Sequence, residues 1–128
     1  MEINKSPLVL AYLGDSIYEV YIREFLINKG ICKVNDLQVE SIKYVSAKGQ
    51  SLFLEKLMNE NKLTDEEIKI VLRGRNHKSH KAPKNTDIKT YKLATGFEAL
   101  IGYLYLNKNN DRIKEIINYI LEMEKWKK

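Results

Sequence analysis

The most constraining feature of this sequence is a long uncharged stretch that keeps a single acid. Residues 93–106, LATGFEALIGYLYL, contain Glu98 as their only charged side chain. A helix with so few polar positions is buried on nearly all sides. Residues 6–18 are similar, because Asp15 is their only charged side chain. We therefore predict two core helices that each carry one buried or half-buried carboxylate.

Small residues surround both acids and would allow the two helices to approach closely. A buried carboxylate without a partner costs several kcal/mol, so each acid must be paired, protonated or bound to a cation. In a structural interpretation, the acids accept buried hydrogen bonds or pair with Arg23 or Lys92. In a functional interpretation, their oxygens converge on a divalent metal ion such as Mg²⁺. The small residues are Ala11, Gly14 and Ser16 near Asp15, and Ala94, Thr95, Gly96, Ala99 and Gly102 near Glu98.

The pattern of the chain predicts an all-α fold in one domain. The 128 residues are enough for a single core, and two prolines with few alternating β-branched runs favour helices throughout. Capping boxes, Asn35 with Gln38 and Thr64 with Glu67, mark two helix starts. The predicted helices span residues 7–28, 35–44, 47–59, 65–73 and 87–106, and the last carries Ile113, Ile116, Ile117, Ile120 and Leu121 on one face.

Composition excludes several classes of protein. The single Cys32 allows neither an intrachain disulfide nor a zinc cluster. No apolar run approaches the roughly 20 residues of a membrane helix, and Met1 begins no secretory leader. We therefore expect a cytoplasmic protein without membrane association.

Positive charge is concentrated in one segment. The chain has 22 Lys and Arg against 17 Asp and Glu, and residues 73–92 hold seven of the bases against one acid. Apolar residues disappear over residues 74–86, which predicts an exposed basic loop. A concentrated basic patch indicates a polyanionic partner, and a metal site beside it favours phosphodiester hydrolysis. The seven bases are Arg73, Arg75, Lys78, Lys81, Lys84, Lys89 and Lys92.

Two motifs resemble those of the ribonuclease III family. YLGDSIYE, residues 12–19, resembles the signature helix of that family, and TGFEALIGYLYL, residues 95–106, resembles its second acidic motif. Their order and separation extend the resemblance over residues 1–128 as one ribonuclease III-like catalytic domain. Because no double-stranded-RNA-binding domain is expected beside it, the chain looks most like the Mini-ribonuclease III branch.

The resemblance implies a Mg²⁺-dependent endoribonuclease that cuts double-stranded RNA and leaves 5′-phosphate and 3′-hydroxyl ends. It gives Asp15 and Glu98 the roles of metal ligands and catalytic residues. Ala11 and Thr95 stand where the wider family has two further carboxylates, a loss that is typical of the Mini branch. The branch matures large-subunit (23S) ribosomal RNA precursors. A two-fold homodimer in which each subunit cuts one strand is expected as well, because the apolar helices have more hydrophobic surface than one small core can cover, and the resemblance implies the same. Whether a ribosomal protein assists stays open.

The basic loop resembles the Mini-ribonuclease III segment that grips RNA. Its Arg and Lys side chains would neutralise phosphates, and its Asn and Thr side chains would reach 2′-hydroxyls. His77 and His80 fit RNA contact or solvent exposure better than metal binding. Glu19, one turn after Asp15, is either an auxiliary ligand or a surface ion-pair partner. The expected RNA-binding residues are Arg73, Arg75, Asn76, Lys78, Lys81, Lys84, Asn85 and Thr86.

Two other functions fit parts of the sequence. The absence of acids at Ala11 and Thr95 is compatible with a catalytically inactive ribonuclease III-like module that binds structured RNA or the ribosome. The basic charge alone is compatible with a helical interaction domain. Retention of Asp15 and Glu98 favours the enzyme, because a binding module has no need to bury them.

Overall fold

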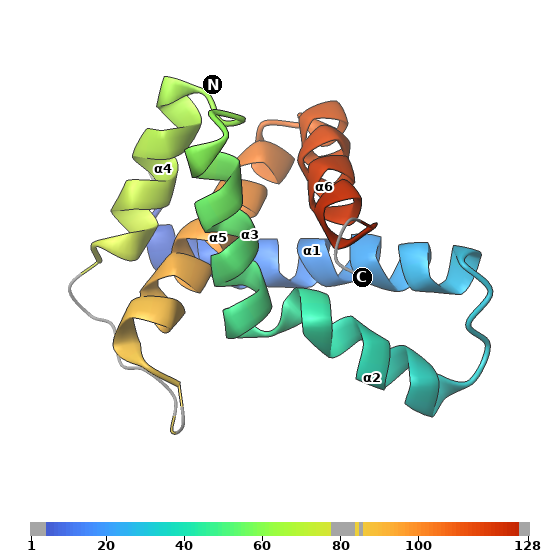
Figure 1. Cartoon of the computed structure of the whole chain (residues 1–128). Coiled ribbons are helices and arrows are strands. Elements are labelled where there is room, and N and C mark those ends of the chain that lie inside the picture. The colour runs from blue at the N-terminus through green and yellow to red at the C-terminus, as the bar shows by residue number, and fades with distance from the viewer. Residues whose placement is uncertain (1–4, 78–83, 85, 126–128) are drawn as a thin grey trace.

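The described residues form a bundle of six helices, and one of them, α5, lies at its centre. The computed structural model describes residues 5–77, 84 and 86–125. Helix α5 contacts α1, α3, α4 and α6, and Figure 1 shows it in the middle of the molecule. The helices are α1 (Pro7–Asn28), α2 (Val34–Val45), α3 (Ala47–Asn59), α4 (Asp65–Arg75), α5 (Ile88–Leu106) and α6 (Asn110–Lys125). The described residues contain no strand, so the all-α prediction is confirmed.

Helix α5 forms the core as its composition predicts. Asp87 caps its first turn by accepting hydrogen bonds from the backbone nitrogen and the Oγ1 of Thr90, both at 2.8 Å. Every residue from 93 to 104 is buried except Glu98. Among the helices that the structure describes, none has the length and apolarity needed to cross a membrane.

Helices α1 and α5 cross in backbone contact through two glycines. A Cβ atom added at Gly14 would lie 1.8 Å from the carbonyl oxygen of Glu98, and one added at Gly102 would lie 2.0 Å from that of Leu10. Real atoms do not approach this closely, so neither position accepts a side chain unless the helices separate. The small residues near both acids therefore do what the sequence predicts.

Helix α4 is fixed at both ends. At its start, Glu67 and Thr64 form the predicted capping box, with nitrogen–oxygen distances of 2.9 and 3.1 Å. Arg112 of α6 reaches across and donates to both carboxylate oxygens of Glu67 at 2.7 Å. Towards its end, Gly74 packs against Gly96 of α5. Helices α4, α5 and α6 are thus joined around one buried ion pair and one close backbone contact.

Two predicted boundaries are wrong. Helix α2 begins at Val34, and its N-cap, Lys33, makes no side-chain capping bond, so Asn35 and Gln38 lie inside the helix and form no capping box. Gly30, with a φ of 105°, follows the predicted end of α1.

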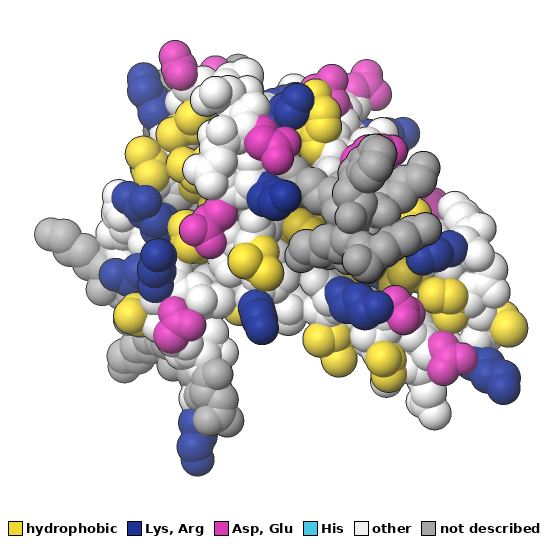
Figure 2. All heavy atoms as spheres, viewed as in Figure 1, with side chains coloured by type: hydrophobic (Ala, Val, Ile, Leu, Met, Phe, Trp, Pro, Cys, Tyr) yellow, Lys and Arg dark blue, Asp and Glu magenta, His cyan; other side chains and the backbone are white. Residues whose placement is uncertain are grey.

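Helix α4 also extends beyond its predicted end at residue 73. It continues to Arg75 because Gly74 fits against α5 as part of the helix. The basic residue Arg75 therefore lies on a helix and not on the predicted loop. Arg73, Lys89 and Lys92 lie on helices as predicted. Figure 2 shows Lys and Arg side chains gathered over the α4 side of the molecule.

Because α1 and α5 touch at Gly14, a single methyl group added there is expected to lower the stability of the fold strongly. We expect Gly14→Ala to lower the free energy of unfolding by about 3 kcal/mol, because the added Cβ overlaps the backbone of α5. Ser16→Ala, on the exposed side of α1, serves as the control and is expected to change it by less than about 0.5 kcal/mol. Urea denaturation measures both. Equal stability of the two variants would show that the helices do not touch at Gly14.

Candidate active site

The two core acids face each other where α1 and α5 cross. Asp15 follows Gly14, and Gly14 contacts the backbone of Glu98 directly. Both acids are half-buried, and their carboxyl groups share a side-chain hydrogen bond. The close approach of two helices, each with one acid on it, therefore brings these carboxylates together as the sequence predicts.

The surroundings of this pair disfavour two negative charges. Burial raises the pKa of Glu98 most, the negative charge of Asp15 and the hydrogen bond with it raise it further, and the resulting pKa is about 8. Glu19 adds a smaller effect in the same direction. The carboxyl pair is consequently short of positive charge, and a bound cation would supply it.

Neither of the basic residues considered as structural partners neutralises the acids. Arg23 pairs with Glu19 on the surface, with Nη2 and Oε1 3.1 Å apart. Within the described part of the chain, no ion pair joins Lys92 to Asp15 or Glu98. Of the structural interpretation, only hydrogen bonds of the two acids remain, and no ion pair of the described residues does.

A third side chain of this site, Gln50 of α3, was missed by the sequence analysis. It is 1% exposed and lies beside Glu98, whose pKa its side chain lowers through a hydrogen bond. A signal for it exists in the sequence, because residue 50 falls on the same helical face as the buried Phe53, Leu54 and Leu57. A polar residue on such an apolar face is unusual, and periodicity alone would have singled it out.

The donor set fits a hydrated magnesium ion. Within the described residues, no three His, Cys, Asp or Glu side chains are arranged to hold a metal ion. Mg²⁺ does not need such a set, because it keeps several waters and is commonly bound through one or two carboxylates and a substrate phosphate. Asp15 and Glu98 provide that pair, and no cation among the described residues competes for it.

The positions one turn before each acid provide no carboxylate oxygen. Ala11 is apolar and buried. Thr95 is buried too, and its Oγ1 donates to the carbonyl of Tyr91 at 3.0 Å. The site therefore differs from a four-carboxylate centre in structure as well as in sequence.

Part of the expected RNA-binding set lies at the end of α4, which packs on α5. The end of α4 contacts α5 at Gly96 and Ala99, on either side of Glu98 in sequence. Arg73 is exposed there, and the Nε of Arg75 donates to Asn76 Oδ1 at 3.1 Å. Lys84 is exposed, Thr86 is half-buried and His77 belongs to no metal cluster of described residues. Lys78, Lys81, Asn85 and His80 lie outside the described residues.

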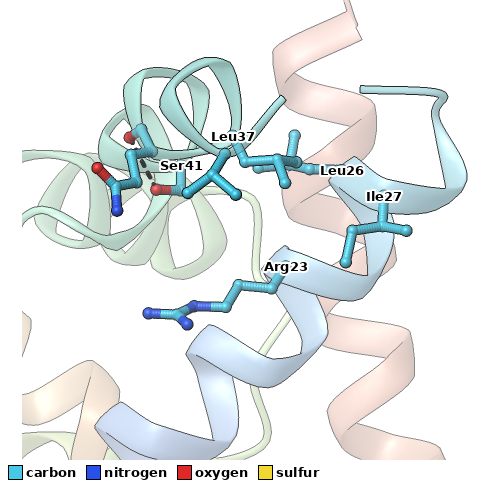
Figure 3. Close-up of a pocket in the computed structure, with 7 residues that line it drawn as sticks. Arg23, Leu26, Ile27, Leu37 and Ser41 are labelled. Carbon is cyan, nitrogen blue, oxygen red and sulfur yellow. Dashed lines mark hydrogen bonds between the residues drawn. The ribbon is translucent and has the colours of Figure 1, made fainter. Parts of the chain in front are cut away.

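A separate groove lies between α1 and α2 (Figure 3). Its volume is about 250 Å³, and Leu26 and Ile27 of α1 face Leu37 of α2 across it. Neither acid lines this groove, and Ile27 and Val34 at its edge are large exposed apolar side chains. The groove is therefore a feature of the surface and not part of the carboxylate site. Arg23, Leu26, Ile27, Val34, Leu37, Gln38 and Ser41 line it.

Comparison with known proteins agrees with this architecture. The family described as Ribonuclease III domain matches residues 8–109. Proteins named Mini-ribonuclease 3 from Enterococcus faecalis and Staphylococcus aureus are 46% and 47% identical, and the alignments cover 90% and 91% of this chain and 87% of each relative. A crystal structure of a Fusobacterium nucleatum protein has a TM-score of 0.82 at 37% identity, over 94% of this chain and 95% of that one.

The raised pKa of Glu98 predicts how stability depends on pH without metal. Between about pH 4.5 and pH 8 the folded protein holds a proton on Glu98 that the unfolded chain releases. We therefore expect the stability of the protein in EDTA to fall as the pH rises through this window. Glu98→Gln removes the charge, so its stability should fall less and exceed that of the parent by about 2 kcal/mol near pH 8.

Urea unfolding at the two ends of this window measures the effect. Glu55→Gln, at an exposed position on α3, is the control and should follow the parent. A parent protein whose stability rises over the same range would contradict this description of the buried pair.

Proposed function

Because this chain belongs to the ribonuclease III family, and within it to the Mini-ribonuclease 3 group, it is an RNA endonuclease, and we propose that Asp15 and Glu98 form its magnesium-dependent catalytic centre. The observation that carries the proposal is the buried pair of carboxyl groups that no Lys or Arg of the described chain neutralises. A bound Mg²⁺ lowers the pKa of water and stabilises negative charge on a phosphate group. The two acids hold the cation where α1 and α5 cross.

The proposed substrate is double-stranded RNA. The basic residues at the end of α4 lie beside the part of α5 that carries Glu98, so RNA held there reaches the carboxylates. Phosphate contacts from Arg73, Arg75 and Lys84 position the duplex, while Asn76 and Thr86 contact 2′-hydroxyls in the shallow minor groove. Lys78, Lys81 and Asn85 extend the proposed contact set. The proposed biological substrate is a precursor of 23S ribosomal RNA.

The proposed reaction is hydrolysis of a phosphodiester. A water molecule attacks the phosphorus in line and the bond to the 3′-oxygen breaks, which leaves a 5′-phosphate and a 3′-hydroxyl. Asp15 and Glu98 would hold the cation, and the cation would stabilise the negative charge that develops on the phosphate. The protein carries out this reaction as one catalytic domain over residues 1–128.

The protein is proposed to act as a two-fold symmetric homodimer. An exposed apolar stripe runs along α1, in which Val9, Tyr12, Val20 and Ile27 follow one another at three- to eight-residue intervals, and Tyr12 is 83% exposed. The groove between α1 and α2 continues this surface at Ile27. Burial of such a stripe against its own copy covers it, and most soluble homo-oligomers close by two-fold symmetry. Duplex RNA has local two-fold axes, so two equivalent sites face two strands.

The alternative is a ribonuclease III-like module that binds RNA without cutting it, and mutation of the acids distinguishes the two. We expect Asp15→Asn and Glu98→Gln each to reduce cleavage of a precursor ribosomal RNA duplex in Mg²⁺ by at least about 1,000-fold, because they remove charged ligands of nearly unchanged shape. RNA affinity in Ca²⁺ and its dependence on salt should not change. Glu55→Gln is the matched surface control. Wild-type protein that binds the duplex but never cuts it would support the binding module.

The dimer is tested by charge reversal on the apolar stripe. We expect Tyr12→Glu with Val20→Glu to weaken dimerisation at least about 30-fold, since each buries a charge in the apolar interface. Leu52→Glu, on α3, is the control because Leu52 is also an exposed apolar residue. Sedimentation velocity measures the oligomeric state. Mixed dimers with one Asp15→Asn subunit should nick one strand only, and an active wild-type monomer would refute the arrangement.

A further inference from the structure

Gln50 occupies a position where the fold otherwise requires hydrocarbon. It lies on the face of α3 that buries Phe53, Leu54 and Leu57, and it is 1% exposed. The preceding residue, Gly49, holds α3 against the end of α2, because a Cβ added there would lie 2.2 Å from the carbonyl oxygen of Lys43. The corner between α2 and α3 therefore fixes the place of Gln50 closely.

Only one of the two polar atoms of the Gln50 amide has a hydrogen-bond partner among the described residues. Its Nε2 donates to the carbonyl of Val45 at 3.1 Å, and the side chain lies beside Glu98, whose pKa it lowers. Its Oε1 is buried and has no hydrogen-bond partner among the described residues. An unsatisfied buried acceptor costs free energy that a leucine of similar volume would not cost. A donor from outside the polypeptide is the simplest partner for this oxygen.

The carboxylate pair beside Gln50 indicates which donor this is. Mg²⁺ held by two carboxylates keeps several waters, and side chains that accept hydrogen bonds from those waters orient the whole shell. Ala11 cannot do so because it is apolar, and Thr95 directs its hydroxyl hydrogen at the carbonyl of Tyr91, one turn earlier on α5. Gln50 offers an acceptor without adding a third negative charge to the buried pair.

We infer that Gln50 is a positioning residue of the cation site, whose Nε2 orients the Glu98 carboxylate and whose Oε1 accepts a hydrogen bond from a water molecule in the hydration shell of the cation. This inference rests on the proposed function, since it assumes a divalent cation at Asp15 and Glu98. It assigns to α3 a part in a site that the sequence motifs place on α1 and α5 alone.

Binding of Mn²⁺ tests the inference without relying on activity. Mn²⁺ takes oxygen ligands as Mg²⁺ does, and the loss of its free electron paramagnetic resonance signal reports binding. We expect Gln50→Leu to weaken Mn²⁺ binding about 10-fold, the usual effect of removing a group that orients metal ligands, while the melting temperature in EDTA stays equal or rises. A folded Gln50→Leu protein with parental Mn²⁺ affinity would overturn the inference.

Asn107 provides a matched control. Its Oδ1 is also buried without a partner among the described residues, but it lies at the C-terminal end of α5, more than two turns beyond Glu98. Asn107→Leu should therefore leave Mn²⁺ affinity unchanged. An equal loss in both variants would assign the effect of Gln50→Leu to general loosening of the core and would also overturn the inference.

Gln50→Glu keeps the test decisive if Gln50→Leu does not fold. A third carboxyl group beside the pair should lower the melting temperature in EDTA and make the rise caused by Mn²⁺ larger than in the parent. A rise no larger than in the parent would place residue 50 outside the reach of the cation. Failure of the proposed function has a different signature. The parent protein would then bind Mn²⁺ no more tightly than Asp15→Asn or Glu98→Gln does.

Discussion

The backbone contact between α1 and α5 is the constraint on which the rest of the structure depends. Gly14 and Gly102 let the two helices touch, since neither position has room for a Cβ atom. The contact places consecutive residues of α1 against one turn of α5, so Asp15 meets Glu98. Side chains of ordinary size at these glycines would hold helices about 8–10 Å apart and separate the acids.

The rest of the bundle offsets what this site costs in stability. Two carboxyl groups meet in a half-buried position, and burial together with their mutual repulsion raises the pKa of Glu98. Away from the site, the charges are arranged favourably. Burial of Glu67 opposes its ionisation, but hydrogen bonds from Arg112 and Thr64 outweigh this and lower its pKa. Burial of the apolar side chains of α5 and α6 stabilises the fold and offsets the free energy lost at the carboxylate site.

The site draws on three helices that are distant in sequence. Asp15 lies on α1, Glu98 on α5, and Gln50 reaches them from the corner between α2 and α3. The end of α4 brings basic residues to the same region through the contact of Gly74 with Gly96. Central placement of α5 explains this convergence, because each of the other elements involved packs on it. A change in the packing of α5 would therefore affect cation, substrate and fold together.

The sequence by itself determined the helical class, most helix boundaries and the two acids. These predictions follow from local rules. Apolar spacing, the Thr64 cap and a lone charge in a long uncharged run can each be recognised from residues that are neighbours in the sequence. Local rules failed at the start of α2, where the expected capping box does not form, and at the end of α4, where the packing of Gly74 against α5 extends the helix.

Only the tertiary structure decided what surrounds the acids. It showed that Gln50 lies beside Glu98, which depends on a contact between residues far apart in the chain. Sequence periodicity can mark residue 50 as facing inwards, but it cannot say which buried group it meets. That information arises only when α3 packs against α5, because the partner of a buried polar group is set by the packing of helices and not by its neighbours in sequence.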